Sequence, residues 1–264
     1  MLVGMASALK VTVRYPATEN PLFLRGSGCG LSWDAGLPLT RVSDTAWELE
    51  LSGCDSAIEV KALLNDSQWM RGANAVVSSS SSTVYPWFHA TEGTFQTLPA
   101  VWSPQLNISR DVIVYLPPSY RENTLKAHAN VLVMHDGNNL FDPETAFMGN
   151  SWLIQETLDP HIEYGVIEEV VVVGAYNTPD RMNEYTYSVD PGEGFGGKGD
   201  LYLDFLEQTL IPLVNSTLRV DLTSNVGLGI MGSSLGGLIS CYAGWTRQTY
   251  SRVGCMSSSF WWNN

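Results

Sequence analysis

One stretch near the end of the chain limits the possible folds more than any other. The apolar run at residues 225–231 predicts a buried strand, and the glycine-rich segment 232–237 predicts a sharp turn. An apolar stretch with a helical pattern follows at residues 238–245. The order of strand, tight turn and helix favours an α/β fold, because parallel strands are usually joined through helices.

The turn carries a candidate nucleophile. Gly232, Ser234 and Gly236 match the pattern Gly-x-Ser-x-Gly, in which the turn is so tight that side chains beside the serine would clash. A match at three positions is common by chance, and the alternative is a turn that merely packs closely or binds an anion. The strand pattern before it and the helix pattern after it favour Ser234 as a nucleophile.

The partners of such a serine do not follow it in this sequence. A serine hydroxyl needs a base, usually a histidine oriented by a carboxylate, and α/β-hydrolases place both after the serine. Residues 235–264 contain no His, Asp or Glu. We therefore expect either a fragment of a longer hydrolase or a relative that has lost its triad, and the strand pattern at residues 252–259 favours the fragment. The four histidines all precede the serine: His89, His128, His135 and His161.

Composition restricts the classes of partner. The chain has 264 residues, of which 44% are hydrophobic and 16% charged, as is typical of a folded protein with one large or two modest cores. Its net charge of -13 argues against nucleic acid and anionic membrane surfaces as partners, since both attract basic patches. No apolar stretch approaches the roughly 18 residues of a spanning helix. Residues 1–13 lack the length and basic start of a signal peptide.

Cysteines and glycosylation sequons bear on the compartment. Cys29 and Cys54 lie near glycine-rich turns and are candidates for a disulfide, whereas Cys241 and Cys255 are expected to be buried free thiols. Sequons of the form Asn-x-Ser/Thr are glycosylated only in secreted eukaryotic proteins. The compartment stays open, with secretion or an organelle both possible. Three sequons occur, at Asn65, Asn107 and Asn215.

The two parts of the chain differ in pattern. Residues 11–77 hold short alternating runs between Gly, Pro, Asn and Asp, which predicts antiparallel strands. We therefore expect a small β-sandwich and a linker at residues 1–99. The serine run at 78–82 is expected to be a loop or linker. Residues 100–264 alternate apolar strands with helical patterns, which predicts an α/β domain with a mostly parallel sheet. Pro212, inside the helical pattern at 200–215, predicts a kink or a helix restart.

A serine nucleophile also needs donors for the negative charge that develops on the ester oxygen. In this arrangement one donor is the N–H of the next residue, Leu235, and the second comes from a loop after an earlier strand. The strand predicted at residues 130–134 leads into such a loop, so we expect the second donor in the backbone near Asp136 and Gly137. We expect His135, at the end of that strand, to be structural.

Five ordered motifs resemble the esterase family of α/β-hydrolases that includes esterase D-like, feruloyl, acetylxylan and enterochelin esterases. They lie at residues 109–120, 135–141, 180–185, 197–206 and 232–237. The resemblance implies an incomplete α/β-hydrolase domain at residues 100–264, with Ser234 as nucleophile, Leu235 as an oxyanion donor, and no metal or organic cofactor. It also implies that the acid and the histidine would lie beyond Asn264. For Arg181 and Glu184, in the third motif, we expect an ion pair that braces a loop.

The N-terminal part contains tryptophans in an order that resembles a starch-binding carbohydrate-binding module. Exposed indoles stack on sugar rings, and Lys and Asn side chains donate hydrogen bonds to sugar hydroxyls. By this resemblance Trp33, Lys61, Trp69 and Asn74 bind a starch-like glucan, and Trp47 belongs to the core. The alternative is that all three tryptophans are core residues.

The leading interpretation is a serine carboxylic-ester hydrolase that acts through an acyl-serine intermediate and carries a glucan-binding module. Its partners are then an ester and a glucan, without nucleic acid or membrane. One alternative is a noncatalytic glucan-binding protein with a hydrolase scaffold. Another is an acyltransferase, because an alcohol competes with water for the same intermediate.

Overall fold

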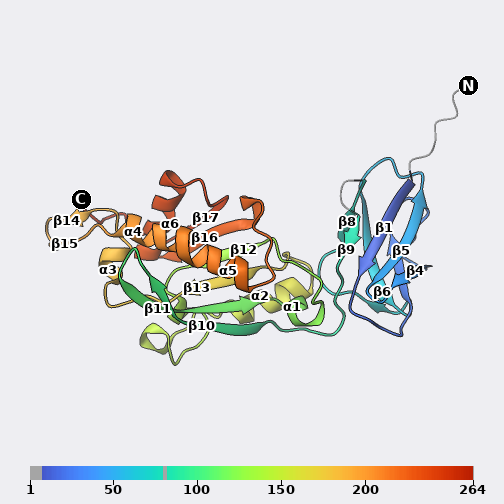
Figure 1. Ribbon diagram of the computed structural model, residues 1–264, viewed down its shortest axis with the longest axis horizontal. Helices are drawn as coiled ribbons and strands as arrows, with labels where there is room; N and C mark the ends of the chain where they lie inside the picture. Colours follow the sequence, from blue (N-terminus) through green and yellow to red (C-terminus); the bar gives the residue numbers. More distant parts are fainter. Residues whose placement is uncertain (1–7, 80–81, 264) are drawn as a thin grey trace, which may run out of the picture. The chain divides into compact units, whose positions relative to one another are not determined.

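The computed structural model describes residues 8–79 and 82–263 (Figure 1). The chain forms two compact units. The first contains the residues up to Gly93 with residues 118–126 and 159–168, and the second contains the remainder. The predicted division at residue 99 falls inside strand β10, Thr94–Ser103, which belongs to the second unit. Two residues of the predicted serine linker, Ser80 and Ser81, lie outside the described residues. So do residues 1–7, at the start of the segment 1–13 that lacks the pattern of a signal peptide.

The first unit is built from two β-sheets around a shared apolar core. One sheet has the order β4-β5-β1-β9, and the other has the order β3-β2-β6-β7 with β8 also paired to β6. Side chains alternate along β1, where Leu9, Val11 and Val13 are buried and point into the core. The bounds are β1 Ala8–Arg14, β2 Leu22–Gly26, β3 Leu37–Pro38, β4 Thr40–Ser43, β5 Ala46–Ser52, β6 Ile58–Leu64, β7 Gln68–Trp69, β8 Ala75–Val77 and β9 Thr83–Val84.

Two later segments complete this unit. Glu122, at the end of helix α1 (Ser119–Glu122), accepts hydrogen bonds from the backbone N–H groups of residues 88–90 and from the Tyr15 hydroxyl. Helix α2 (Ile154–Glu163) contributes its last turn, where Glu163 forms an ion pair with Arg71. The compact N-terminal unit therefore includes residues that follow its β-strands in the sequence by tens of positions, and these residues form hydrogen bonds and an ion pair with it.

The second unit is centred on a six-stranded sheet of order β10-β11-β13-β12-β16-β17. The pairs β10-β11 and β11-β13 are antiparallel, and the remaining three pairs are parallel. This mixed, mostly parallel sheet after N-terminal β-sheets confirms the predicted fold class. The strands are β10 Thr94–Ser103, β11 Ile108–Leu116, β12 Val131–Met134, β13 Val171–Ala175, β16 Leu228–Ser233 and β17 Arg252–Met256.

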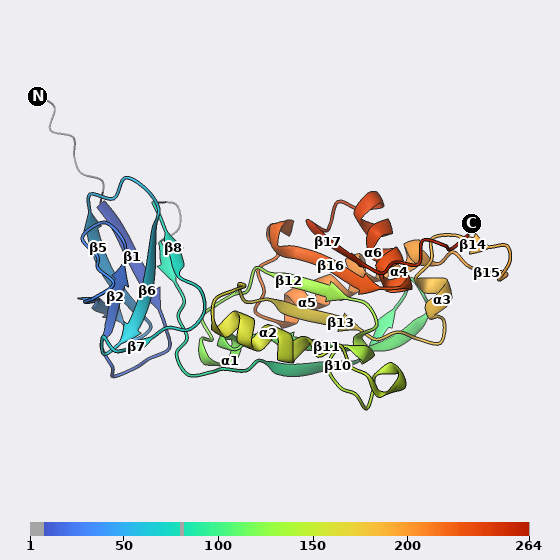
Figure 2. The same cartoon turned by 180° about the vertical axis from the view of Figure 1, so that it is seen from behind.

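Helices cover both faces of this sheet. Helices α4 (Gly199–Phe205), α5 (Ile211–Thr217) and α6 (Leu235–Thr246) lie on one face, and the start of α2 lies on the other (Figures 1 and 2). A π-helical turn, Leu206–Leu210, joins α4 to α5, and Pro212 stands in the first turn of α5. The helical conformation continues without a break from α4 through the π-helical turn into α5, so the helix does not restart at Pro212. The irregularity next to the proline is the π-helical turn, in which the backbone hydrogen bonds are shifted by one residue. None of the described helices is long and apolar enough to cross a membrane.

Shorter elements connect these. They are the 3-10 turns η1 Gly137–Asn139, η2 Phe147–Gly149 and η4 Asn225–Gly227, helix α3 Arg181–Glu184, and the hairpin of β14 Val189–Asp190 with β15 Phe195–Gly196.

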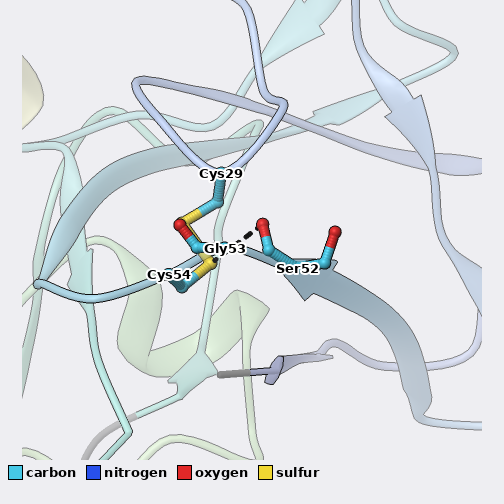
Figure 3. The surroundings of a disulfide bond; sticks show 4 residues. All are labelled: Cys29, Ser52, Gly53 and Cys54. Carbon is cyan, nitrogen blue, oxygen red and sulfur yellow. Dashed lines mark hydrogen bonds between the residues drawn. A yellow bond between two sulfur atoms is a disulfide. The ribbon is translucent and has the colours of Figure 1, made fainter. Parts of the chain in front are cut away.

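All four cysteines form disulfides. Cys29 is bonded to Cys54, as expected, with a Cα–Cα distance of 5.2 Å (Figure 3). Cys241 is bonded to Cys255, with a Cα–Cα distance of 5.7 Å, so the prediction of two free thiols is wrong. The reason is the packing of α6 against β17, which brings these two positions face to face.

Candidate active site

Ser234 lies in a strained turn between β16 and α6 (Figure 1). Its backbone has φ 58° and ψ -120°, a conformation that a residue with a side chain rarely adopts and that costs about 1–3 kcal/mol. The Ser234 N–H donates to the Met256 carbonyl oxygen over 3.0 Å, which ties the turn to the end of β17. The residue itself is exposed. The turn predicted from the glycine pattern thus presents a hydroxyl to solvent at the head of a helix.

The glycines of this turn are required by contact. A Cβ atom on Gly232 would lie 2.7 Å from the Gly236 carbonyl carbon and 2.7 Å from His135 Cδ2. A Cβ atom on Gly237 would lie 2.7 Å from the Met256 carbonyl oxygen. These distances are too short for any side chain, so the strand and the helix can approach this closely only through glycine.

The hydroxyl of Ser234 has another serine as its partner. Ser234 Oγ and Ser259 Oγ are 3.1 Å apart, and the Ser259 N–H donates to the Ser234 carbonyl oxygen over 3.0 Å. Within residues 8–79 and 82–263, no histidine or carboxylate is hydrogen-bonded to Ser234. Sequence reasoning missed Ser259, because nothing in a run of three serines after β17 distinguishes the one that reaches the turn.

His135 is buried behind the turn. Its Nδ1 lies 2.9 Å from the Tyr202 hydroxyl, and its buried Nε2 has no hydrogen-bond partner in the part of the chain that the structure describes. Burial lowers the pKa of His135 to about 4, so the ring is neutral near neutral pH. These contacts agree with the prediction that His135 is structural.

The expected oxyanion donors are not equivalent. Leu235 begins α6, so its N–H is among the helix N–H groups that lack an acceptor within the helix. The Asp136 N–H donates to the Tyr185 hydroxyl over 3.1 Å. Among the described residues, the N–H of Gly137 has no acceptor. Leu235 and Gly137 therefore present open amides, whereas the amide of Asp136 is already used.

Two ion pairs brace the loops around this site. Arg181 forms a two-pronged pair with Asp136, with Nε–Oδ1 2.6 Å and Nη2–Oδ2 2.8 Å. Glu184 forms a fully buried pair with Arg110, with both N–O distances 2.9 Å. The ion pair expected for Arg181 and Glu184 thus exists as two separate pairs, because α3 directs one side chain to the loop after β12 and the other to β11.

The comparisons with known proteins agree with this geometry. The family model described as "Putative esterase" matches residues 103–264. This chain belongs to that esterase family. Its fold is that of the α/β-hydrolases, and the family consists of serine hydrolases and esterases.

Individual relatives cover different parts of this chain. The protein YbbA of Bacillus subtilis strain 168 is 29% identical over 162 residues, which are 59% of this chain and 59% of YbbA. The siderophore hydrolase EstA from Aspergillus nidulans is 22% identical, with a TM-score of 0.51 over 64% of this chain and 59% of EstA. The chain thus spans less than two thirds of these two relatives.

One solved structure is similar over the whole length of the chain. The enterobactin esterase FES from Shigella flexneri is 15% identical, with a TM-score of 0.50 over 100% of this chain and 74% of FES. At this identity the likeness concerns the fold, and it includes the N-terminal β-sheets.

The esterase unit contains two cavities beside the site. One, of about 440 Å³, is lined by Gly137, in the loop after β12, and by Phe95, Phe141 and Tyr176. The other has a volume of about 380 Å³. It is lined by Ser233, Trp152 and Ile154 and by the three methionines Met134, Met231 and Met256. Sequence reasoning predicted neither, because each is lined by residues from several separate segments.

The N-terminal unit of the esterase exposes two of the three singled-out tryptophans. Trp33 and Trp69 are 37% and 39% exposed, and their rings stack with centroids 6.3 Å apart. Trp47 is 2% exposed and lies in the core, as predicted. The alternative that all three are core residues is wrong, since the loop holding Trp33 and the short strand β7 place two indoles outside the sandwich. The guanidinium of Arg25, not singled out from the sequence, lies 5.1 Å from the Trp69 ring centre.

The two polar residues of this set are engaged within the unit. Lys61 Nζ donates to the Met70 and Gly72 carbonyl oxygens, and burial lowers the pKa of Lys61. Asn74 Nδ2 donates to Glu59 Oε2 over 2.9 Å. The exposed indole pair is therefore the part of the predicted set that is open to a ligand.

Proposed function

We propose that this esterase hydrolyses carboxylic esters through an acyl-serine intermediate. Ser234 attacks the ester carbonyl, the N–H groups of Leu235 and Gly137 bind the oxyanion, and water then releases the acid. The observation that carries the proposal is the exposed Ser234 hydroxyl in a strained turn at the start of α6, next to the open amide of Leu235. No metal or organic cofactor is required by this chemistry.

The first step also requires a base to take the proton of Ser234. Its partner among the described residues, Ser259, has a hydroxyl, which is too weak a base for this role. The prediction that a carboxylate and a histidine follow Asn264 stays a prediction. Because loss of the histidine from a serine triad costs about 10⁶-fold in turnover, turnover is best measured on the full-length protein.

Labelling with a fluorophosphonate tests the nucleophile. We expect the full-length protein to be labelled once, and Ser234→Ala to abolish the label. Ser216→Ala is a matched control, because Ser216 is an exposed serine on α5. Equal labelling of the Ser234→Ala and wild-type proteins would refute the assignment.

The same experiment separates the alternatives. A folded wild-type protein that takes no label would favour the noncatalytic glucan-binding protein. For a protein that does react, the ratio of free acid to transferred ester in the presence of an acceptor alcohol separates hydrolysis from acyl transfer.

Esters with an aromatic group are the substrate class that the cavity beside Gly137 favours. Phe95 and Phe141 lie edge to face with ring centres 4.9 Å apart, and both line this cavity. Such walls bind a planar ring well. The similarity to EstA, a siderophore hydrolase, and to FES, an enterobactin esterase, is consistent with siderophore-type esters among the substrates.

A pair of substrates tests this preference. Phe95→Ala is expected to raise KM about 10-fold for an ester of an aromatic acid, equivalent to about 1.4 kcal/mol. An aliphatic ester should be affected much less. Phe147→Ala serves as control, because Phe147 is 74% exposed and does not line the cavity. An equal effect on both esters would contradict the aromatic preference.

For the N-terminal unit we propose glucan binding at the indole pair of Trp33 and Trp69, with Lys61 and Asn74 holding the surrounding backbone and side chains rather than the sugar. The support is the exposed, stacked indole pair. Trp69→Ala should lose retention on amylose beads, while Trp102→Ala, an exposed tryptophan of β10, should retain it. Equal retention of both variants would refute the site.

The two disulfides favour an extracellular or other oxidising compartment.

A further inference from the structure

The loop that follows β12 contains an unusual aspartate. Asp136 has φ 54° and ψ 47°, a left-handed conformation that is uncommon for residues other than glycine. Its carboxylate is almost fully buried, with the side chain 2% exposed. A strained backbone and a buried charge both cost free energy, so strong contacts must hold this residue in place.

Those contacts come from the segment after β13. Arg181 holds both carboxylate oxygens through its fork, and Asn177 Nδ2 donates to Oδ1 over 2.7 Å. Charge-assisted bonds of this two-pronged kind restrict orientation as well as supply energy. The backbone is held too, since the Asp136 N–H donates to the Tyr185 hydroxyl and the Arg181 guanidinium lies 4.9 Å from the Tyr185 ring centre.

The same residue touches the nucleophile turn. A Cβ atom on Gly236 would lie 3.5 Å from Asp136 Oδ2 and 3.3 Å from His135 Cβ, so the aspartate packs against the first turn of α6. The next residue is also tightly packed, since a Cβ atom on Gly137 would lie 2.3 Å from the Gly174 carbonyl oxygen in β13. Gly137 is therefore held between β13 and Asp136, which itself rests on the helix that begins at Leu235.

We propose that Asp136 is a positioning residue, clamped by Arg181 and Asn177, which fixes the Gly137 N–H relative to the Leu235 N–H. This inference rests on the proposed function, because it concerns the two amides that bind the oxyanion. Asp136 acts through the backbone of Gly137 and does not touch the substrate. Loosening the clamp should displace one oxyanion donor while substrate binding stays intact.

The test is Arg181→Lys in the full-length protein, which keeps the charge but loses the two-pronged contact. With p-nitrophenyl acetate, kcat should fall about 100-fold while KM changes less than about threefold, as for a small misplacement of a catalytic group. The affinity for a trifluoromethyl ketone, which forms an oxyanion on the serine, should fall by a similar factor. Arg247→Lys is the matched control, because Arg247 pairs with Asp204 away from this loop.

Each outcome decides the inference. An active wild type whose kcat is unchanged by Arg181→Lys, or whose KM alone changes, overturns the positioning role and leaves the proposed function standing. A full-length wild type that hydrolyses no ester refutes the proposed function and this inference with it. If Arg181→Lys does not fold, Asn177→Ala decides, since it removes one hydrogen bond from Asp136 and should lower kcat about 10-fold with KM unchanged.

Discussion

Replacing Glu122 by glutamine should destabilise the N-terminal unit more than a typical surface substitution. Oε1 accepts from the Phe88 N–H and the Tyr15 hydroxyl over 2.6 and 2.9 Å. Oε2 accepts from the N–H groups of His89 and Ala90 over 2.9 and 2.8 Å. This single carboxylate thus accepts four hydrogen bonds, three of them from the backbone N–H groups of residues 88–90.

The size of the effect follows from the geometry of an amide. In the glutamine variant the side-chain NH2 group destabilises the fold least when it takes the place of Oε1. There the Tyr15 hydroxyl can rotate and accept a hydrogen bond from it, but the Phe88 N–H loses its acceptor. A buried donor left without a partner costs about 1–3 kcal/mol, and the bonds at Oε2 lose their charge assistance. We therefore expect Glu122→Gln to lower the free energy of unfolding by about 2–4 kcal/mol.

Urea denaturation measures this change. With a slope of about 1–3 kcal/mol per M, the loss shifts the midpoint of the N-terminal unit by about 1 M or more. The exposed neighbour Glu92 provides the control variant Glu92→Gln. A folded Glu122→Gln protein with an unchanged midpoint would refute the reasoning, because the four bonds would then contribute no net stability.

The dependence on pH gives a second readout of the same carboxylate. Burial raises the pKa of Glu122, but hydrogen bonds from the N–H groups of Ala90, Phe88 and His89 outweigh it and leave the pKa below its usual range. The folded state therefore releases this proton more readily than the unfolded state. Its stabilisation is present above the usual glutamate pKa and is lost as pH falls through the lowered value. Glu122→Gln should lack this contribution at every pH.

Two further changes test the second unit. Cys241→Ser should lower the free energy of unfolding by about 3 kcal/mol in the loop-entropy model, because the disulfide to Cys255 closes a loop with a sequence separation of 14. Denaturation with and without reductant measures this change. If the reductant lowers the stability of the variant as much as that of the wild type, the prediction is contradicted. Gly232→Ala should lower the free energy of unfolding by about 1–3 kcal/mol, because the new methyl group meets His135 and the backbone of Gly236. It should also slow fluorophosphonate labelling of Ser234 at least about 10-fold. A normal labelling rate would show that the turn accommodates the methyl group.

Local patterns were sufficient to predict much of the architecture. Short alternating runs predicted antiparallel strands in the N-terminal part, and the apolar run at residues 130–134 predicted β12, because one or both faces of a strand must be buried. The glycine spacing around Ser234 predicted a turn that only glycine can build. These inferences succeed because each depends on residues within about ten positions of one another.

The residues that brace the site could not be predicted in the same way. Asp136 meets Arg181 across 45 positions, and Glu122 meets Phe88 across 34, with no pattern in the sequence that links either pair. The Cys241–Cys255 disulfide likewise depends on how α6 lies on β17.

The sequence by itself determined the β character of the N-terminal part, the mostly parallel α/β sheet of the later part and the tight turn at Ser234, because local sterics and burial encode them. Only the tertiary structure decided that Ser259 is the partner of Ser234, that Gly137 presents an open amide where Asp136 does not, and that Trp33 and Trp69 stack at the surface. The physical reason is that directional contacts between distant residues depend on how whole elements pack, and packing is a property of the assembled fold.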